Sequence, residues 1–141
     1  MKILLAVDGS RYTRKMLAYL VTHEDTFAAS NNEFALFTAH PPLPAHARAA
    51  LGNDVADKYH ADDAERVLAP VSKFLSRHGI DARSAWKVGH AGKAIANFAQ
   101  AGKFDLVLMG SHGHGALANL VMGSVTTQVL AHCKVPVLLV R

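Results

Sequence analysis

One segment of the chain reads Leu106-Val107-Leu108-Met109-Gly110-Ser111-His112-Gly113-His114-Gly115, a short apolar run followed by a glycine-rich turn. The apolar run predicts a strand buried on both faces of a parallel sheet. A helix-like segment follows from Val125 to His132. A glycine-rich turn between a strand and a helix exposes backbone N–H groups where the helix dipole favours anions. No Asp or Glu occurs in residues 106–141, so this segment predicts a site for an anion.

Strands and helices alternate along the rest of the chain. Apolar runs predict strands at residues 3–7, 34–39, 81–88, 106–109 and 135–140. Helical periodicity predicts a helix capped by Ser10, a long helix ending at Gly79, a third ending at Gly102, and the helix over 125–132. Three prolines predict a loop from His40 to about Gly52, and Pro70 predicts a kink or a restart of the long helix. This order predicts an α/β fold, an open parallel sheet with helices on both faces.

Composition limits the class of protein. The 141 residues, half of them apolar, predict a single domain covering 1–141, with no linker or repeat. No apolar run approaches the roughly 18 residues of a membrane span, so we expect a soluble protein. The lone Cys133 is consistent with a reducing cytoplasm. The net charge is +4, but the basic residues are scattered, which disfavours nucleic acid as a partner. The nine histidines show no metal-ligand spacing.

The predicted ligand position follows from the predicted sheet. In open parallel sheets, ligands bind beyond the carboxyl ends of the strands, where the strand order reverses. Asp8, Ala39 and Gly110 each lie at such an end. If the first and fourth strands are central neighbours, these three residues converge on one crevice.

The glycine spacing carries a family resemblance. Gly110, Gly113, Gly123 and Ser124 match the pattern Gly-x2-Gly-x9-Gly-Ser without gaps. In this pattern the chain resembles the nucleotide-binding subgroup of the universal stress protein family. The first strand, ending in Val7-Asp8-Gly9-Ser10, and the closing segment from Val135 to Arg141 are similar to the same family.

The resemblance implies a five-stranded parallel sheet in the order 3-2-1-4-5, a homodimer, and ATP as ligand, alone or with Mg²⁺ or Mn²⁺. It places Asp8 at the adenine or ribose, the backbone of Ala39 at the adenine edge, and Met109 and Gly110 along the ribose. The phosphates would be held by Gly113, Gly123, Ser124, the backbone of Val125 and the hydroxyl of Thr126.

Three functions are compatible with these features. The first is an ATP-binding, cytoplasmic regulator that acts in the stress response on other proteins. The second is a slow ATP hydrolase or a nucleotidyl-transfer enzyme, although residues 106–141 offer no carboxylate as a base. The third is a protein-interaction module that holds no nucleotide. A purely structural alternative is that the glycines serve only close packing and that Asp8 caps the first helix. In an enzyme, His112 or His114 could polarise a water, but hydrogen-bonding a phosphate is the favoured role for these two histidines.

The closing strand also predicts assembly. In the order 3-2-1-4-5, residues 135–140 lie at a sheet edge, and they carry five apolar residues beside Pro136. An exposed apolar edge strand favours aggregation unless it is covered or paired. We therefore expect a two-fold homodimer in which these strands meet antiparallel.

Overall fold

The computed structural model describes residues 1–115 and 119–141. Its strands are β1 (Lys2–Ala6), β2 (Glu33–His40), β3 (Ala82–Val88), β4 (Leu106–Gly110) and β5 (Val137–Val140). Its helices are α1 (Arg11–Thr22), α2 (Glu24–Phe27), α3 (Ala45–Leu51), α4 (Asn53–Arg77), α5 (Ala91–Ala101) and α6 (Ser124–His132). The strands pair in parallel in the order β3-β2-β1-β4-β5, which confirms the predicted fold class and strand order.

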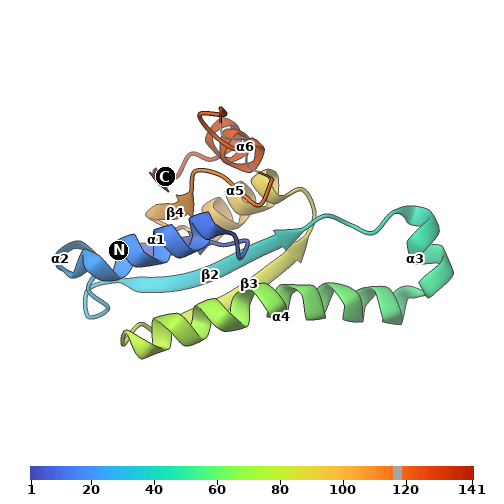
Figure 1. The fold of residues 1–141 in the computed structure, drawn as a ribbon, viewed down its shortest axis with the longest axis horizontal. Helices are drawn as coiled ribbons and strands as arrows, with labels where there is room; N and C mark the ends of the chain where they lie inside the picture. The colour runs from blue at the N-terminus through green and yellow to red at the C-terminus, as the bar shows by residue number, and fades with distance from the viewer. Residues whose placement is uncertain (116–118) are drawn as a thin grey trace.

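Helices cover both faces of the sheet (Figure 1). Side chains of β1 alternate between the two faces, because successive residues of a strand point in opposite directions. Ile3 packs in a core with Met16 of α1 and Leu68 of α4. Leu4 packs in a second core with Ile95 of α5. A strand buried on both faces must be apolar throughout, which explains the uninterrupted run in β1.

Two helix ends follow the predicted capping chemistry. The Ser10 hydroxyl accepts a hydrogen bond from the N–H of Thr13 at 3.4 Å and begins α1. Helix α4 ends before Gly79, whose φ of +72° lies in the left-handed region that glycine tolerates. The N–H of Ile80 then donates to the Leu75 carbonyl at 3.0 Å and turns the chain toward β3.

The loop predicted from His40 to about Gly52 is wrong in its second half, where α3 forms. The prolines at positions 41, 42 and 44 all precede the first turn of this helix, and Pro44 lies at its N-cap. A proline there removes no hydrogen bond that the helix needs. The sequence from Ala45 to Leu51 contains four alanines, the residue with the highest helix propensity.

The predicted restart at Pro70 is also wrong, because α4 is one continuous helix of 25 residues. Proline lacks the N–H that would donate to the carbonyl of Arg66. Both Arg66 and Pro70 are exposed, so water can solvate that carbonyl. Leu68 and Val71 are buried on either side of the break in hydrogen bonding and hold the two halves of the helix on the sheet.

None of the helices in the described ranges combines the length and the apolar character that crossing a membrane requires.

Candidate functional site

A cavity of about 320 Å³ lies at the carboxyl edge of the sheet, where β1 is flanked by β2 and β4. Asp8, Ala39 and Gly110 line this one cavity, as their positions at strand ends predicted. All nine residues predicted to bind nucleotide line it: Asp8, Ala39, Met109, Gly110, Gly113, Gly123, Ser124, Val125 and Thr126. Their contacts with a nucleotide stay a prediction.

Asp8 directs one carboxylate oxygen toward the turn between β1 and α1, in which it lies. It directs the other toward Gly113 of the glycine loop, the name used here for the segment between β4 and α6. Its Oδ1 accepts hydrogen bonds from the N–H of Ser10 and from the Thr13 hydroxyl, both at 2.9 Å. Its Oδ2 lies 2.9 Å from the position that a Cβ on Gly113 would take. Asp8 therefore both orders the start of α1 and faces the loop, so a carboxylate does lie beside this loop although residues 106–141 contain none.

The first turn of α6 borders the cavity. Gly123 is the N-cap and supplies no side-chain cap, and the first turn contains no acidic residue. Ser124 and Val125, at the start of the helix, line the cavity. N–H groups in the first turn have no partner within a helix, and the dipole makes this end positive. This end of α6 can therefore accept an anion.

Ser111 joins β5 to both ends of the loop. Its N–H donates to the Val140 carbonyl at 2.8 Å, and its carbonyl accepts from the N–H of Gly123 at 2.8 Å. The same carbonyl accepts from the hydroxyl of Thr126 at 3.0 Å, and that hydroxyl also lies 3.3 Å from the Gly110 carbonyl. A hydroxyl has one proton to donate, so the predicted contact between the Thr126 hydroxyl and a phosphate does not fit this geometry. Thr126 instead anchors the loop.

The three motif glycines differ in what a side chain would meet. A Cβ on Gly110 would lie 2.6 Å from Cβ of Tyr12, and one on Gly123 would lie 3.1 Å from Cα of His112. Close packing alone therefore accounts for glycine at these two positions. A Cβ on Gly113 would meet only the Asp8 carboxylate, so this glycine is the one that keeps space open inside the cavity.

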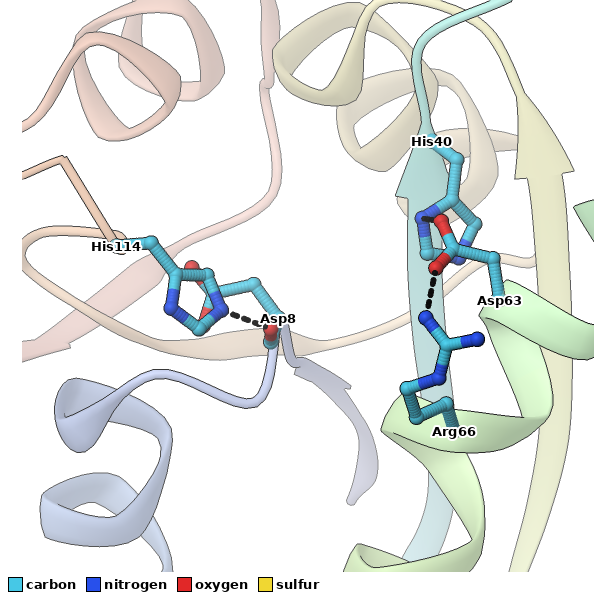
Figure 2. A network of polar contacts seen from close by, with 5 residues as sticks. All are labelled: Asp8, His40, Asp63, Arg66 and His114. Atoms are coloured by element: carbon cyan, nitrogen blue, oxygen red, sulfur yellow. Dashed lines mark hydrogen bonds and ion pairs between the residues drawn. The ribbon is translucent and has the colours of Figure 1, made fainter.

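Two loop histidines hold the loop in place. Nδ1 of His112 lies 2.8 Å from the Ser111 hydroxyl, and its Nε2 lies 2.8 Å from the Leu120 carbonyl. Nε2 of His114 lies 2.6 Å from the backbone carbonyl of Asp8, which fastens the loop to the turn after β1 (Figure 2). The partner of His114 could not be predicted, because Asp8 and His114 are 106 positions apart in the sequence.

Prediction from sequence also missed an apolar wall of the cavity. Its residues come from the end of β1, the position just after β1, and α5, and their orientation depends on the assembled fold: Ala6, Val7, Ala91 and Ile95. Among the described residues, the ionisable side chains lining the cavity are Asp8, His112 and His114, and no Lys or Arg lines it. Within 1–115 and 119–141, no three His, Cys, Asp or Glu side chains are grouped to hold a metal.

Comparison with known proteins gives a family match over the whole chain. The model of the universal stress protein family matches residues 1–141. A universal stress protein of Thermus aquaticus is 32% identical over 143 residues, which cover 99% of this chain and 97% of that protein. Universal stress protein Slr1230 of Synechocystis is 34% identical over 140 residues, but the chain spans only 42% of its length.

Solved structures are similar over the same range. Protein MJ0577 of Methanocaldococcus jannaschii superposes with a TM-score of 0.82 at 25% identity, covering 99% of this chain and 94% of that one. A universal stress protein in complex with cAMP superposes with a TM-score of 0.68 at 25% identity, covering 100% of this chain and 97% of that one. The universal stress protein of Archaeoglobus fulgidus in complex with dAMP superposes with a TM-score of 0.67 at 17% identity, covering 100% of this chain and 98% of that one. At this identity the similarity shows the fold alone.

Proposed function

The chain belongs to the universal stress protein family, and on that premise we propose that it binds ATP and acts as a nucleotide-dependent regulator in the stress response. The observation that carries this proposal is the positive end of α6, which has no side-chain cap and borders a cavity at the carboxyl ends of β1, β2 and β4. The relative in complex with cAMP is 25% identical to this chain, which supports an adenine nucleotide as the ligand class.

Each part of the cavity suits one part of a nucleotide. The N–H groups at Ser124 and Val125, with the Ser124 hydroxyl, would receive phosphate oxygens. Apolar side chains of Ala39, Ile95 and Met109 form the wall against which an adenine ring would pack. Ala39 is small, so this wall restricts the base weakly.

A divalent cation would enter with the nucleotide. Mg²⁺ is usually held by one or two carboxylates together with substrate phosphates. Asp8 is the one carboxylate that lines the cavity among the described residues, and its Oδ2 faces the loop. The donor set therefore fits Mg²⁺ or Mn²⁺ only as the counter-ion of a bound polyphosphate, with Asp8 as its protein ligand.

We further propose that the chain, one domain over 1–141, works in the cytoplasm as a homodimer that acts on regulatory protein partners. β5 lies at the edge of the sheet, and its four residues, Val137–Val140, are each partly exposed. Antiparallel pairing of two β5 strands about a two-fold axis would cover this edge. Pro136 lies before the strand, so its missing N–H costs no pairing bond within β5.

Mass spectrometry of the small molecules released from protein purified without added nucleotide tests the ligand. Calorimetric titration with ATP measures its affinity. Retained adenine nucleotide and saturable ATP binding are the expected results. Protein that retains no nucleotide and gives no binding heat with ATP would favour the nucleotide-free interaction module instead.

One observation favours ATP hydrolysis as a second candidate function. The Asp8 carboxylate lies beside the glycine loop, where it could accept a proton from an attacking water. Phosphate release that stays linear over many cycles per protein molecule, and that Asp8→Asn abolishes, would support an enzyme. Asp54→Asn, a change in the first turn of α4, serves as the control.

A further inference from the structure

Strand β2 extends past the end of its neighbour β1 at the edge of the cavity. β1 ends at Ala6, opposite Phe37, and the next bond between the two segments runs from the N–H of Val7 to the Phe37 carbonyl at 3.0 Å. Residues 38–40 of β2 lie beyond this point and, in the part of the chain that the structure describes, pair with β3 alone. The last stretch of β2 is therefore held by one strand rather than by two.

The backbone of Ala39 points into the gap that the end of β1 leaves. In a strand, the N–H and C=O groups of successive residues point to opposite sides. The carbonyl of His40 faces β3, where it accepts from the N–H of Gly89 at 2.8 Å. The N–H and carbonyl of Ala39 therefore face the other way, past the end of β1, and Ala39 lines the cavity. These two groups offer a ligand one donor and one acceptor.

A carbonyl in a fixed position distinguishes adenine from guanine. Adenine carries an amino donor at the ring position where guanine carries a carbonyl acceptor. The Ala39 carbonyl can accept from the amine of adenine, but it would face the oxygen of guanine with no proton between them. The side chain of Ala39 is too small to restrict the base by packing, so the position of its carbonyl must supply the base selectivity of a bound nucleotide.

The side chain of His40 anchors this end of β2. It points to the opposite face of the sheet from Ala39, where its Nδ1 lies 3.1 Å from Oδ2 of Asp63 on α4 (Figure 2). A carboxylate only accepts hydrogen bonds, so Nδ1 is the donor. Oδ1 of the same carboxylate accepts from Arg66 at 3.1 Å, which orients Asp63. His40 is 8% exposed, so water competes little for its bond.

The imidazole at position 40 costs folding free energy that an apolar side chain would not. Its Nε2 is buried without a hydrogen-bond partner among the described residues. An unpaired buried polar atom lowers the free energy of unfolding, and apolar side chains often replace a buried polar pair without loss. Packing alone therefore does not explain histidine here. The bond from Nδ1 to Asp63 does, because it ties the end of β2 to α4.

Resting on the proposed function, we propose that His40 is a positioning residue that sets the base selectivity of the nucleotide site. Its bond to Asp63 holds the end of β2 on α4, and with it the carbonyl of Ala39 at the cavity. His40 does not line the cavity and acts through its neighbour in the strand. The ligand class that follows is adenine nucleotides, with guanine nucleotides disfavoured by hydrogen bonding rather than by size.

Calorimetric titration of the full chain with ATP and, separately, with GTP tests the proposal. His40→Leu removes the donor and Asp63→Ala removes the acceptor, whereas His40→Asn keeps an amide N–H near the position of Nδ1. Arg83→Leu is the control, because it removes an ion pair with Glu33 at the opposite end of β2, outside the cavity. Chemical denaturation measures the free energy of unfolding of each variant.

We expect the wild type, His40→Asn and Arg83→Leu to bind ATP about tenfold more tightly than GTP. His40→Leu and Asp63→Ala should lose about five- to tenfold in ATP affinity and little in GTP affinity, so that the preference for ATP disappears. His40→Leu should unfold at a denaturant concentration similar to that of the wild type. Should His40→Leu not fold, Asp63→Ala gives the answer, because the Asp63 side chain is partly exposed.

A wild type without preference for ATP, or variants that keep the wild-type preference, would overturn this inference while leaving the proposed function intact. Equal losses of ATP and GTP affinity would also overturn it, because a general structural defect does not distinguish the bases. So would a loss of the preference in His40→Asn. No binding of ATP by the wild type would overturn the proposed function itself, and this inference with it.

Discussion

Gly113→Ala tests whether the glycine loop has a binding role separate from its packing role. The added Cβ would lie 2.9 Å from Oδ2 of Asp8, and this oxygen is the one neighbouring atom that it meets. The φ of Gly113 is not in the positive region, so alanine fits its backbone. The carboxylate can tilt by a few tenths of an ångström, while Oδ1 keeps its bonds to Ser10 and Thr13. We expect a loss of folding free energy of at most about 1 kcal/mol.

We expect Gly113→Ala to cost more free energy in nucleotide binding than in folding. The methyl group fills the space between Asp8 and the loop that a phosphate must enter. Overpacking of a fitted site costs about 1–3 kcal/mol, and the middle of that range, about 2 kcal/mol, weakens ATP binding about thirtyfold. Gly113→Val, with two more methyl groups, should abolish measurable binding.

Gly110→Ala is the matched comparison. Its Cβ would meet the Cβ of Tyr12 at 2.6 Å and the Tyr12 carbonyl carbon at 3.1 Å, so helix α1 must move away from β4. We expect this variant to lose about 2–4 kcal/mol of folding free energy. Calorimetric titration with ATP measures the binding affinity of both variants, and chemical denaturation measures their folding free energy. The reasoning is refuted if Gly113→Ala binds ATP like the wild type, or if it unfolds as readily as Gly110→Ala.

Three further changes test other parts of the structure. Ser124→Ala removes one hydrogen bond to a charged acceptor and should weaken ATP binding by about 1–2 kcal/mol in calorimetric titration, whereas an unchanged affinity would exclude this hydroxyl from the phosphate site. Leu138→Lys places a charge on the proposed dimer strand and should convert dimers into monomers or aggregates in light scattering; a wild-type protein that is already monomeric would contradict the dimer. Pro70→Ala restores the N–H that can donate to Arg66 and should stabilise the fold by about 1–3 kcal/mol in chemical denaturation, and a destabilised variant would show that Pro70 packs favourably.

Strands and most helices could be predicted because their signals are local. The run Leu106–Met109 is apolar without interruption because β4 is buried between two layers of helices. The strand order came from the family resemblance, since local periodicity does not specify which strands are neighbours. The two errors, α3 and the continuity of α4, share one cause. Proline disrupts a helix by removing one hydrogen bond and by crowding the carbonyl four residues earlier with its ring. Pro44, at the N-cap of α3, does neither, and at Pro70 of α4 the freed carbonyl can be solvated by water.

The lining of the candidate site could be predicted, but its internal contacts could not. Positions at strand ends indicated Asp8, Ala39 and Gly110, and the family resemblance supplied the other six lining residues. The role of Thr126 was missed because its buried hydroxyl donates to a carbonyl 15 positions earlier. The bond from His114 to Asp8 joins segments 106 positions apart, a distance over which sequence periodicity carries no information.

The backbone bonds of Ser111 couple the edge strand β5 to the start of α6. The N–H of Ser111 donates to Val140 at the end of β5. The carbonyl of Ser111 accepts from Gly123 and Thr126 at the start of α6. A second chain pairing along β5 would restrict the motion of Ser111, and with it both ends of the loop, before any nucleotide arrives. Less conformational entropy of Ser111 and Gly123 would then be lost when phosphates bind beside them. Association of two subunits would thereby raise nucleotide affinity without any contact between the partner chain and the ligand.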